Sequence, residues 1–187
     1  MIKWIALLLV VFLLSCEKSG IMTYKVPKQT VTVAQLSVQG SYKTLVWSVP
    51  EAWIEQDLTS FRLSSYQIPN QSNGIGDFSV VKFPGDAGGI LANVNRWRGQ
   101  LGLSSISVGD LASLFVRVEH PFLSITFLEL HRANKLLSSD DIESMYVGFF
   151  MYDNESYFFK LTGSKPLLQL NRESFITILK SIVYESS

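Results

Sequence analysis

The spacing of apolar positions divides the chain into several predicted strands. Short stretches that are rich in aromatic and β-branched residues, and that are bounded by Pro, Gly or Asn, are typical of strands. A brief alternation of Val with polar residues over residues 30–38 predicts a short edge strand or an extended lead-in. The better strand predictions are, in chain order, residues 43–49, 60–68, 77–83, 122–130, 145–152 and 157–162. Turn-rich connections between the first three predict a meander, and residues 153–156 predict a hairpin connection between the last two.

Two stretches between these groups of strands have a helical period. Four apolar residues fall at i, i+4, i+7 and i+11, which defines one helical face: Ile90, Val94, Trp97 and Leu101. They predict a helix over residues 88–101 that ends at Gly102. A shorter helix is predicted over residues 108–116, although residues 115–118 suit a strand equally well.

The end of the chain predicts a final helix that covers the sheet. Its apolar stripe is formed by Phe175, Ile178, Leu179 and Ile182, and Asn171 is positioned to cap it. Strands grouped before and after one or two helices favour an α+β fold, an antiparallel β-sheet with helices packed on it.

The first 16 residues have the pattern of a secretory signal. Lys3 precedes an apolar run over residues 5–14, and this run is well short of the roughly 20 residues that span a bilayer. The small residue Ser15 and then Cys16 follow. Residues 13–16, Leu-Leu-Ser-Cys, resemble the lipobox of bacterial lipoproteins. The resemblance implies that Cys16 receives a diacylglyceryl group and that cleavage occurs in front of it; the alternative is an ordinary secretory signal with a chance cysteine.

This interpretation divides the chain into three parts. Residues 1–15 are the lipoprotein signal peptide, residues 16–29 are the lipidated N-terminus and a flexible tether, and residues 30–187 are a single domain. A mature lipoprotein carries two or three acyl chains, which suffice for stable membrane attachment. Glu17 stands where Asp often retains enterobacterial lipoproteins in the inner membrane. We therefore expect the outer membrane of a Gram-negative cell envelope, with the domain facing the periplasm.

Composition narrows the possible partners. The 16 Lys and Arg residues balance 16 Asp and Glu residues, so no net field attracts a polyanion, and nucleic acid is not expected as a partner. The single cysteine is the lipidated one, so stability must come from packing rather than from disulfides. The 12 Phe, 7 Tyr and 4 Trp residues favour a sheet-rich core.

Two segments resemble a known family when they are taken together. Residues 47–53, Trp-Ser-Val-Pro-Glu-Ala-Trp, and residues 175–184, with Ser181-Ile182, resemble the opening and closing of domains with the Mog1/PsbP-like fold. The resemblance implies a strand that leads into a proline and tryptophan turn, and a last helix that covers the sheet. Members are mostly non-catalytic accessory or binding modules, many of them secreted or lipid-anchored. Residues 84–103 and 158–163 resemble motifs of uncharacterised bacterial envelope proteins, with no assigned activity.

The candidate binding residues are Asn93, Arg96 and Gln100. Their spacing of i, i+3 and i+7 places them on one stripe beside the apolar helical face. Planar amide and guanidinium groups suit a carboxylate, a sugar or a peptide backbone, and Trp97 offers an aromatic neighbour. If they bind a ligand, we expect all three to be exposed together. The alternative, which we favour, is that they hydrogen-bond the helix to adjacent loops or face water.

Other motifs give little support for a catalytic site or a cofactor. The Gly-rich residues 85–89 precede a helix, but no Lys-Ser or Lys-Thr pair follows and Asp86 would repel a phosphate, so a turn is predicted. His120 and His131 belong to no metal-ligand pattern. No Gly-x-Ser-x-Gly elbow is present. We expect no metal and no cofactor, and we assign no catalytic residue.

The sequence thus predicts a lipid-anchored envelope protein that acts as a non-catalytic binding or accessory module. A protein partner is expected rather than a small molecule, and Trp47, Trp53 and Trp97 are expected in the core rather than on a carbohydrate. One alternative is an envelope hydrolase, which would show a deep pocket with a perturbed carboxylate or histidine. Another is a structural lipoprotein without a ligand.

Overall fold

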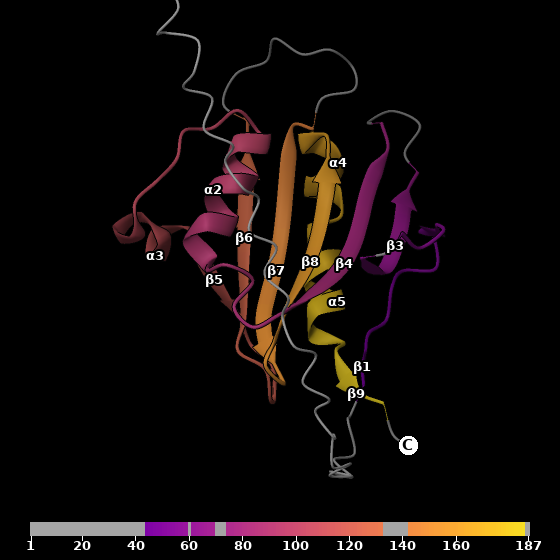
Figure 1. The fold of residues 1–187 in the computed structure, drawn as a ribbon. Coiled ribbons are helices and arrows are strands. Elements are labelled where there is room, and N and C mark those ends of the chain that lie inside the picture. The colour runs from indigo at the N-terminus through magenta and orange to yellow at the C-terminus, as the bar shows by residue number, and fades with distance from the viewer. Residues whose placement is uncertain (1–43, 60, 70–73, 133–141, 186–187) are drawn as a thin grey trace, which may run out of the picture. The chain divides into compact units, whose positions relative to one another are not determined.

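Seven antiparallel strands form the main sheet of the computed structural model (Figure 1). The model describes residues 44–59, 61–69, 74–132 and 142–185. Across the sheet the order is β2 (Ile54–Glu55), β3 (Arg62–Ile68), β4 (Gly76–Pro84), β8 (Glu155–Gly163), β7 (Ser144–Tyr152), β6 (Ile125–His131) and β5 (Phe115–Val118). Successive side chains of the long central strands point to opposite faces of the sheet, so each face can carry a core.

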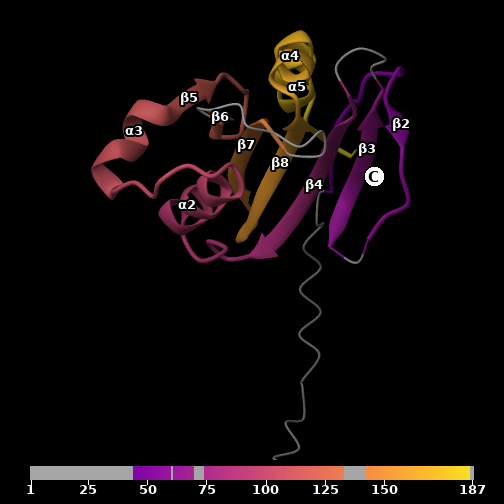
Figure 2. The same ribbon diagram turned by 90° about the horizontal axis from the view of Figure 1, so that it is seen from above.

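Helices pack on both faces of this sheet (Figure 2). One face carries α4 (Lys165–Leu170) and α5 (Arg172–Lys180), and the other carries α2 (Ile90–Gln100), η2 (Val108–Asp110) and α3 (Leu111–Leu114). None of the helices in the described ranges is long and apolar enough to cross a membrane.

The larger core lies under α4 and α5 and is rich in aromatic rings. Phe175 of α5 is fully buried, and its ring centroid lies 6.2 Å from Phe78, 5.7 Å from Phe127 and 6.1 Å from Tyr146. The smaller core lies under α2, where Trp97 packs edge-on against Phe158 at 5.6 Å. Each fully buried large apolar side chain contributes about 1.5–3 kcal/mol to folding.

A second, two-stranded sheet joins the two ends of the domain. β1 (Leu45–Val46) pairs antiparallel with β9 (Val183–Tyr184), which follows α5. Just after β1, the Ser48 N–H donates to Ser181 Oγ at 2.9 Å, and the Trp47 ring packs edge-on against Phe159 at 4.9 Å. These contacts fasten residues 45–50 to the end of α5 and to the main sheet.

The structure confirms the predicted α+β class, an antiparallel sheet with helices packed on it. The strands predicted over residues 60–68, 77–83, 122–130, 145–152 and 157–162 and the helix over residues 88–101 are each present with ends shifted by a few residues. The signal peptide, Cys16, the tether and the strand predicted at residues 30–38 lie outside the described residues.

The structure corrects two details of the prediction and decides a third, the end of the helix at residues 108–116, for which the sequence left two alternatives. Residues 43–49 do not start a meander, because β1 pairs with β9, and β2 takes the edge position beside β3 instead. The helix predicted over residues 108–116 ends at Leu114, because residues 115–118 pair with β6 and bury Val118. Asn171 does precede α5, but its side-chain Nδ2 donates to the Leu167 carbonyl of α4 and does not cap α5.

Candidate binding site

The predicted stripe of Asn93, Arg96 and Gln100 does not form one exposed surface. Asn93 is only 2% exposed, whereas Arg96 and Gln100 are exposed. Asn93 Nδ2 donates to the carbonyls of Ala87 at 3.0 Å and Gly89 at 2.8 Å, and its Oδ1 accepts from Arg96 Nη2 at 2.5 Å. The expectation of joint exposure is therefore wrong, because Asn93 fastens α2 to the turn in front of it. A binding role for Arg96 and Gln100 stays a prediction.

Replacing this buried amide should destabilise the domain. Asn93→Ala removes the donor for two carbonyls and the acceptor for Arg96, so we expect the free energy of unfolding to fall by about 1–2 kcal/mol. Urea unfolding followed by circular dichroism measures the change. Gln100→Ala is the matched control on the same helix, and it should stay within about 0.5 kcal/mol of wild type because Gln100 is exposed. Equal stability of the two variants would contradict the structural role of Asn93.

Residues 85–89 form the predicted turn. Ala87 has a φ of 53° and Gly89 has a φ of 87°, and the Gly88 N–H donates to Asp86 Oδ1 at 3.1 Å. A cavity of about 460 Å³ lies beside this turn and is lined mainly by aromatic and aliphatic side chains. Its two buried polar residues are already bonded within the chain, since Asn93 holds the turn and Ser156 Oγ donates to the Gly85 carbonyl at 2.6 Å. This cavity therefore lacks a buried polar side chain that is free to orient a ligand.

A serine, a histidine and a glutamate lie in line on the sheet face under α5. Ser144 Oγ lies 2.8 Å from His131 Nδ1, and His131 Nε2 lies 3.9 Å from Glu129 Oε2. Burial lowers the pKa of His131, which favours the neutral imidazole that a general base requires. However, Ser144 is 0% exposed, and Glu129 forms its closer ion pair with Arg172, at 2.8 Å. The hydroxyl has no open approach for a substrate, so the arrangement serves to join β6 to β7.

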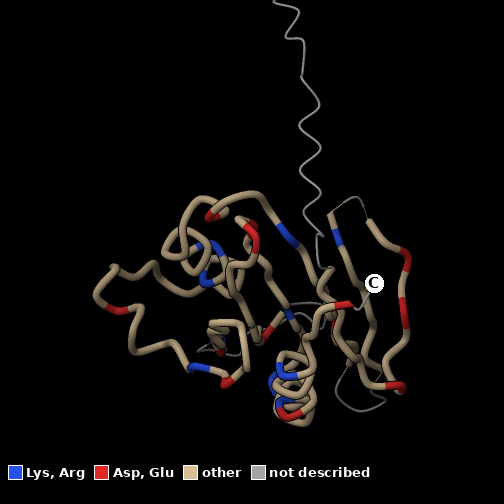
Figure 3. The backbone as a smooth tube through the Cα atoms, turned by 90° about the horizontal axis from the view of Figure 1, so that it is seen from below, with Lys and Arg blue, Asp and Glu red and all other residues tan. Residues whose placement is uncertain are grey.

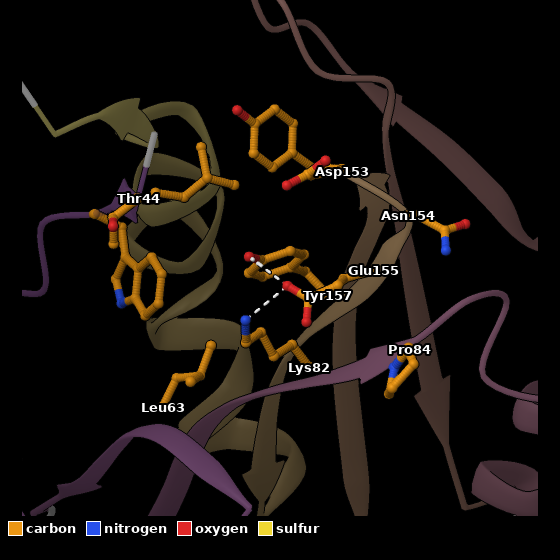
Figure 4. Close-up of a pocket in the computed structure, with 11 residues that line it drawn as sticks. Thr44, Leu63, Lys82, Pro84, Asp153, Asn154, Glu155 and Tyr157 are labelled. Atoms are coloured by element: carbon orange, nitrogen blue, oxygen red, sulfur yellow. Dashed lines mark hydrogen bonds and ion pairs between the residues drawn. The ribbon is translucent and has the colours of Figure 1, made fainter. Parts of the chain in front are cut away.

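A groove with both polar and aromatic lining lies beside the small sheet. Two adjoining cavities of about 690 and 580 Å³ share Leu45, Trp47 and Leu63 in their linings. We call the combined feature the Trp47 groove. Residues 44–51 line one side, and β3 and β4 line the other. The turn between β7 and β8 lies at one end, in the cavity shown in Figure 4.

An ion pair lies at the end of the groove beside the β7–β8 turn. Lys82 Nζ lies 2.6 Å from Glu155 Oε2, and the Tyr157 hydroxyl donates to the same oxygen at 3.4 Å (dashed lines in Figure 4). The hydrogen bond with Glu155 raises the pKa of Lys82, and burial raises the pKa of Tyr157. Both groups therefore keep their protons at neutral pH, and Lys82 neutralises the carboxylate that it contacts.

Beyond this pair the groove is acidic. Its lining holds one lysine against four carboxylates, Glu51, Glu55, Asp153 and Glu155. Around β2, acidic positions follow one another along the chain with no basic position between them (Figure 3). Glu51, Glu55 and Asp153 are exposed, and none of them forms an ion pair with another described residue. The groove thus carries uncompensated negative charge.

No sequence pattern indicated the groove as a whole, although it is lined by Trp47 and Trp53, two of the three tryptophans expected in the core. Trp53 and Trp97 are 6% and 4% exposed, as expected for core residues, whereas Trp47 is only half-buried and lines the groove. Lys82 and Glu155 are 73 positions apart and meet because β4 pairs with β8. The only local sequence pattern that pointed to a part of the groove was the predicted turn between β7 and β8. This turn, at residues 153–154, brings Asp153 and Glu155 to the groove.

The described titratable residues form no obvious metal site. Within the described ranges, no group of three or more His, Cys, Asp and Glu side chains is placed to hold a metal ion.

Comparison with known proteins gives similarity in structure but not in sequence. No family model matches the chain, and no curated protein matches it either. Similar solved structures include a protein of Bacteroides thetaiotaomicron, with 10% identity and a TM-score of 0.45 over 76% of this chain. The chain spans 46% of the length of that protein.

Two further structures are similar over most of their own length. Cyanobacterial PsbP (CyanoP) of Synechocystis shows 13% identity and a TM-score of 0.46 over 75% of this chain and 86% of its own. LpqN, which is involved in cell envelope biogenesis of Mycobacterium tuberculosis, shows 12% identity and a TM-score of 0.44 over 79% of this chain and 88% of its own. At these identities no function follows from the similarity.

Proposed function

We propose that this protein is a lipid-anchored cell-envelope lipoprotein whose domain binds a protein partner through the Trp47 groove. The observation that carries the proposal is the groove itself, two cavities joined at Leu45, Trp47 and Leu63 and lined by both aromatic and charged side chains. Concave sites with apolar walls and a few fixed polar groups are the usual form of a binding site.

The anchor rests on the lipobox-like residues 13–16, with Cys16 as the lipidated residue. An anchor confines the domain to a membrane surface and so raises its effective concentration near a partner in the same membrane. A weakly binding groove then suffices for association. The outer membrane, with the domain facing the periplasm, is the proposed location.

Binding is favoured over catalysis by the way in which the polar groups of the groove are used. Lys82 and Tyr157 both contact Glu155, so the charged groups at this end stabilise one another. The described cluster that most resembles catalytic machinery, Ser144 with His131, lies under α5 and buries its hydroxyl. The groove therefore acts by recognition.

The experiment that tests the anchor compares the wild-type protein with Cys16→Ser in a Gram-negative host. Wild type should be recovered in the membrane fraction as a species whose intact mass corresponds to an acylated Cys16 at the N-terminus. Cys16→Ser should lose the acyl mass and move to the soluble fraction. Glu17→Gln keeps the cysteine, serves as the matched control and should remain in the membrane. An unacylated wild-type product in the soluble fraction would contradict the proposal.

Expression in the same Gram-negative host also tests whether the groove binds a partner. Leu63 lines both cavities and is 40% exposed, so Leu63→Arg places a bulky side chain in the groove with little loss of core packing. Leu170→Arg is the matched control, since Leu170 is 69% exposed on α4. Chemical crosslinking in intact membranes should give a complex with wild type and Leu170→Arg but not with Leu63→Arg. A complex that persists in Leu63→Arg would contradict the assignment of the groove.

A further inference from the structure

We propose that the Trp47 groove recognises an extended polypeptide segment that carries Lys or Arg side chains. This inference rests on the proposed function and deepens it, because it names the chemistry of the partner at the same site. It is carried by the charge, the aromatic lining and the strand edge of the groove.

The negative charge of the groove favours a ligand that carries positive charge. Four carboxylates face one lysine, and that lysine is already paired with Glu155. Glu51 and Glu55 line one cavity and Asp153 lines the other, so each of the two cavities carries negative charge. Complementary charge of this kind steers a basic partner to the surface and discourages an acidic one.

The aromatic lining suits the same ligand. Trp47 lies where the two cavities meet, Trp53 and Tyr66 line one of them, and Tyr152 and Tyr157 line the other. The long alkyl stems of Lys and Arg pack on such rings, and their cationic heads are attracted by the ring faces.

The backbone of β1 favours an extended peptide. β1 pairs only with β9 among the described strands, so it forms one edge of the small sheet and can accept another strand. The groove wall formed by residues 45–50 is at most about 20 Å long, which accommodates about six residues of extended chain. Alternate side chains of such a strand would face the groove and solvent.

The test uses two octapeptides of alternating sequence, one of Lys and Val and the other of Glu and Val, both end-capped and labelled with fluorescein. Fluorescence anisotropy is measured with the full-length mature protein in non-ionic detergent at low and at raised salt. The Lys peptide should bind at least tenfold more tightly than the Glu peptide, and raised salt should weaken its binding. Leu63→Arg should remove this binding, whereas Leu170→Arg should leave it unchanged.

A second pair of variants separates the groove from overall charge. Glu51→Gln with Glu55→Gln should weaken binding of the Lys peptide at least threefold. Glu119→Gln with Glu173→Gln changes the net charge equally at exposed positions outside the groove lining, and it should have no such effect. All four carboxylates are exposed, so folding should be preserved, which circular dichroism confirms.

Equal affinity of the protein for the two peptides would overturn the inference. So would an affinity for the Lys peptide that is the same in wild type and in the groove variants. If the inference fails while Leu63→Arg still abolishes the crosslinked complex, the groove binds a partner of other chemistry and the proposed function stands. If Leu63→Arg leaves that complex intact, the proposed function itself fails.

Discussion

Phe175→Ala should lower the free energy of unfolding by about 3–5 kcal/mol, the largest single-residue effect that we expect in this domain. The Phe175 side chain is 0% exposed and contacts rings from three strands, Phe78 of β4, Phe127 of β6 and Tyr146 of β7. Truncation removes the transfer free energy of the ring and leaves a cavity that a closely packed neighbourhood fills only in part.

Urea unfolding followed by circular dichroism measures this loss. Phe175→Leu retains most of the side-chain volume and should lower the free energy of unfolding by less than Phe175→Ala does. It still gives a measurable loss if the alanine variant does not fold. Leu170→Ala is the control on α4, and because Leu170 is 69% exposed its effect should be within about 0.5 kcal/mol. A loss below about 1 kcal/mol for Phe175→Ala would contradict its central place in the core.

The position of this helix also matters for the groove. Ser181 directly follows α5 and its Oγ accepts the Ser48 N–H, and β9 follows as the partner of β1. The groove wall at residues 45–50 is therefore attached to the end of α5 as well as to the main sheet, which Trp47 contacts through Phe159. Because of this attachment, we expect changes in the large core to affect the groove, and stability should be measured for every groove variant.

The final helix was predictable from sequence because its signal is local. Phe175, Ile178 and Leu179 of α5, together with Ile182 just after its end, belong to one core cluster, and each of them is at most 1% exposed. A period of 3.6 residues fixes which side chains share a face without knowledge of the rest of the fold. The same reasoning correctly placed Trp97 on the buried face of α2.

The groove was not predictable because its parts meet through pairings over long sequence distances. β1 pairs with β9 at the opposite end of the domain, and Lys82 meets Glu155 only when β4 and β8 are in register. Spacing along a helix also misjudged Asn93, since its burial depends on the turn at residues 85–89 that folds back to it. Local sequence patterns predict which residues share one face of a helix or strand. Tertiary packing determines which polar residues on that face remain exposed.

Gly148→Ala should lower the free energy of unfolding by about 2–3 kcal/mol, although it adds only one methyl group. Gly148 lies in the middle of β7 between Phe127 and Phe159 of the flanking strands, and it faces α5. A Cβ at this position would lie 2.5 Å from Leu179 Cδ2 and 2.6 Å from Leu179 Cδ1. Leu179 is 0% exposed, so it cannot move away without disturbing the core around it.

A double-mutant cycle with Leu179→Ala identifies the cause of this loss. If the clash is responsible, Gly148→Ala combined with Leu179→Ala should cost less than the sum of the two single variants by about 1–3 kcal/mol. Additive losses would instead show that the methyl group disturbs the strand itself. Gly99→Ala is the control on α2, where an added Cβ meets no atom within 4 Å, so it should stabilise the protein by about 0.5–1 kcal/mol. If Gly148→Ala lowers the free energy of unfolding and Gly99→Ala raises it, the loss at Gly148 is specific to that position. It would then follow that Gly148 is required because α5 approaches the sheet closely there.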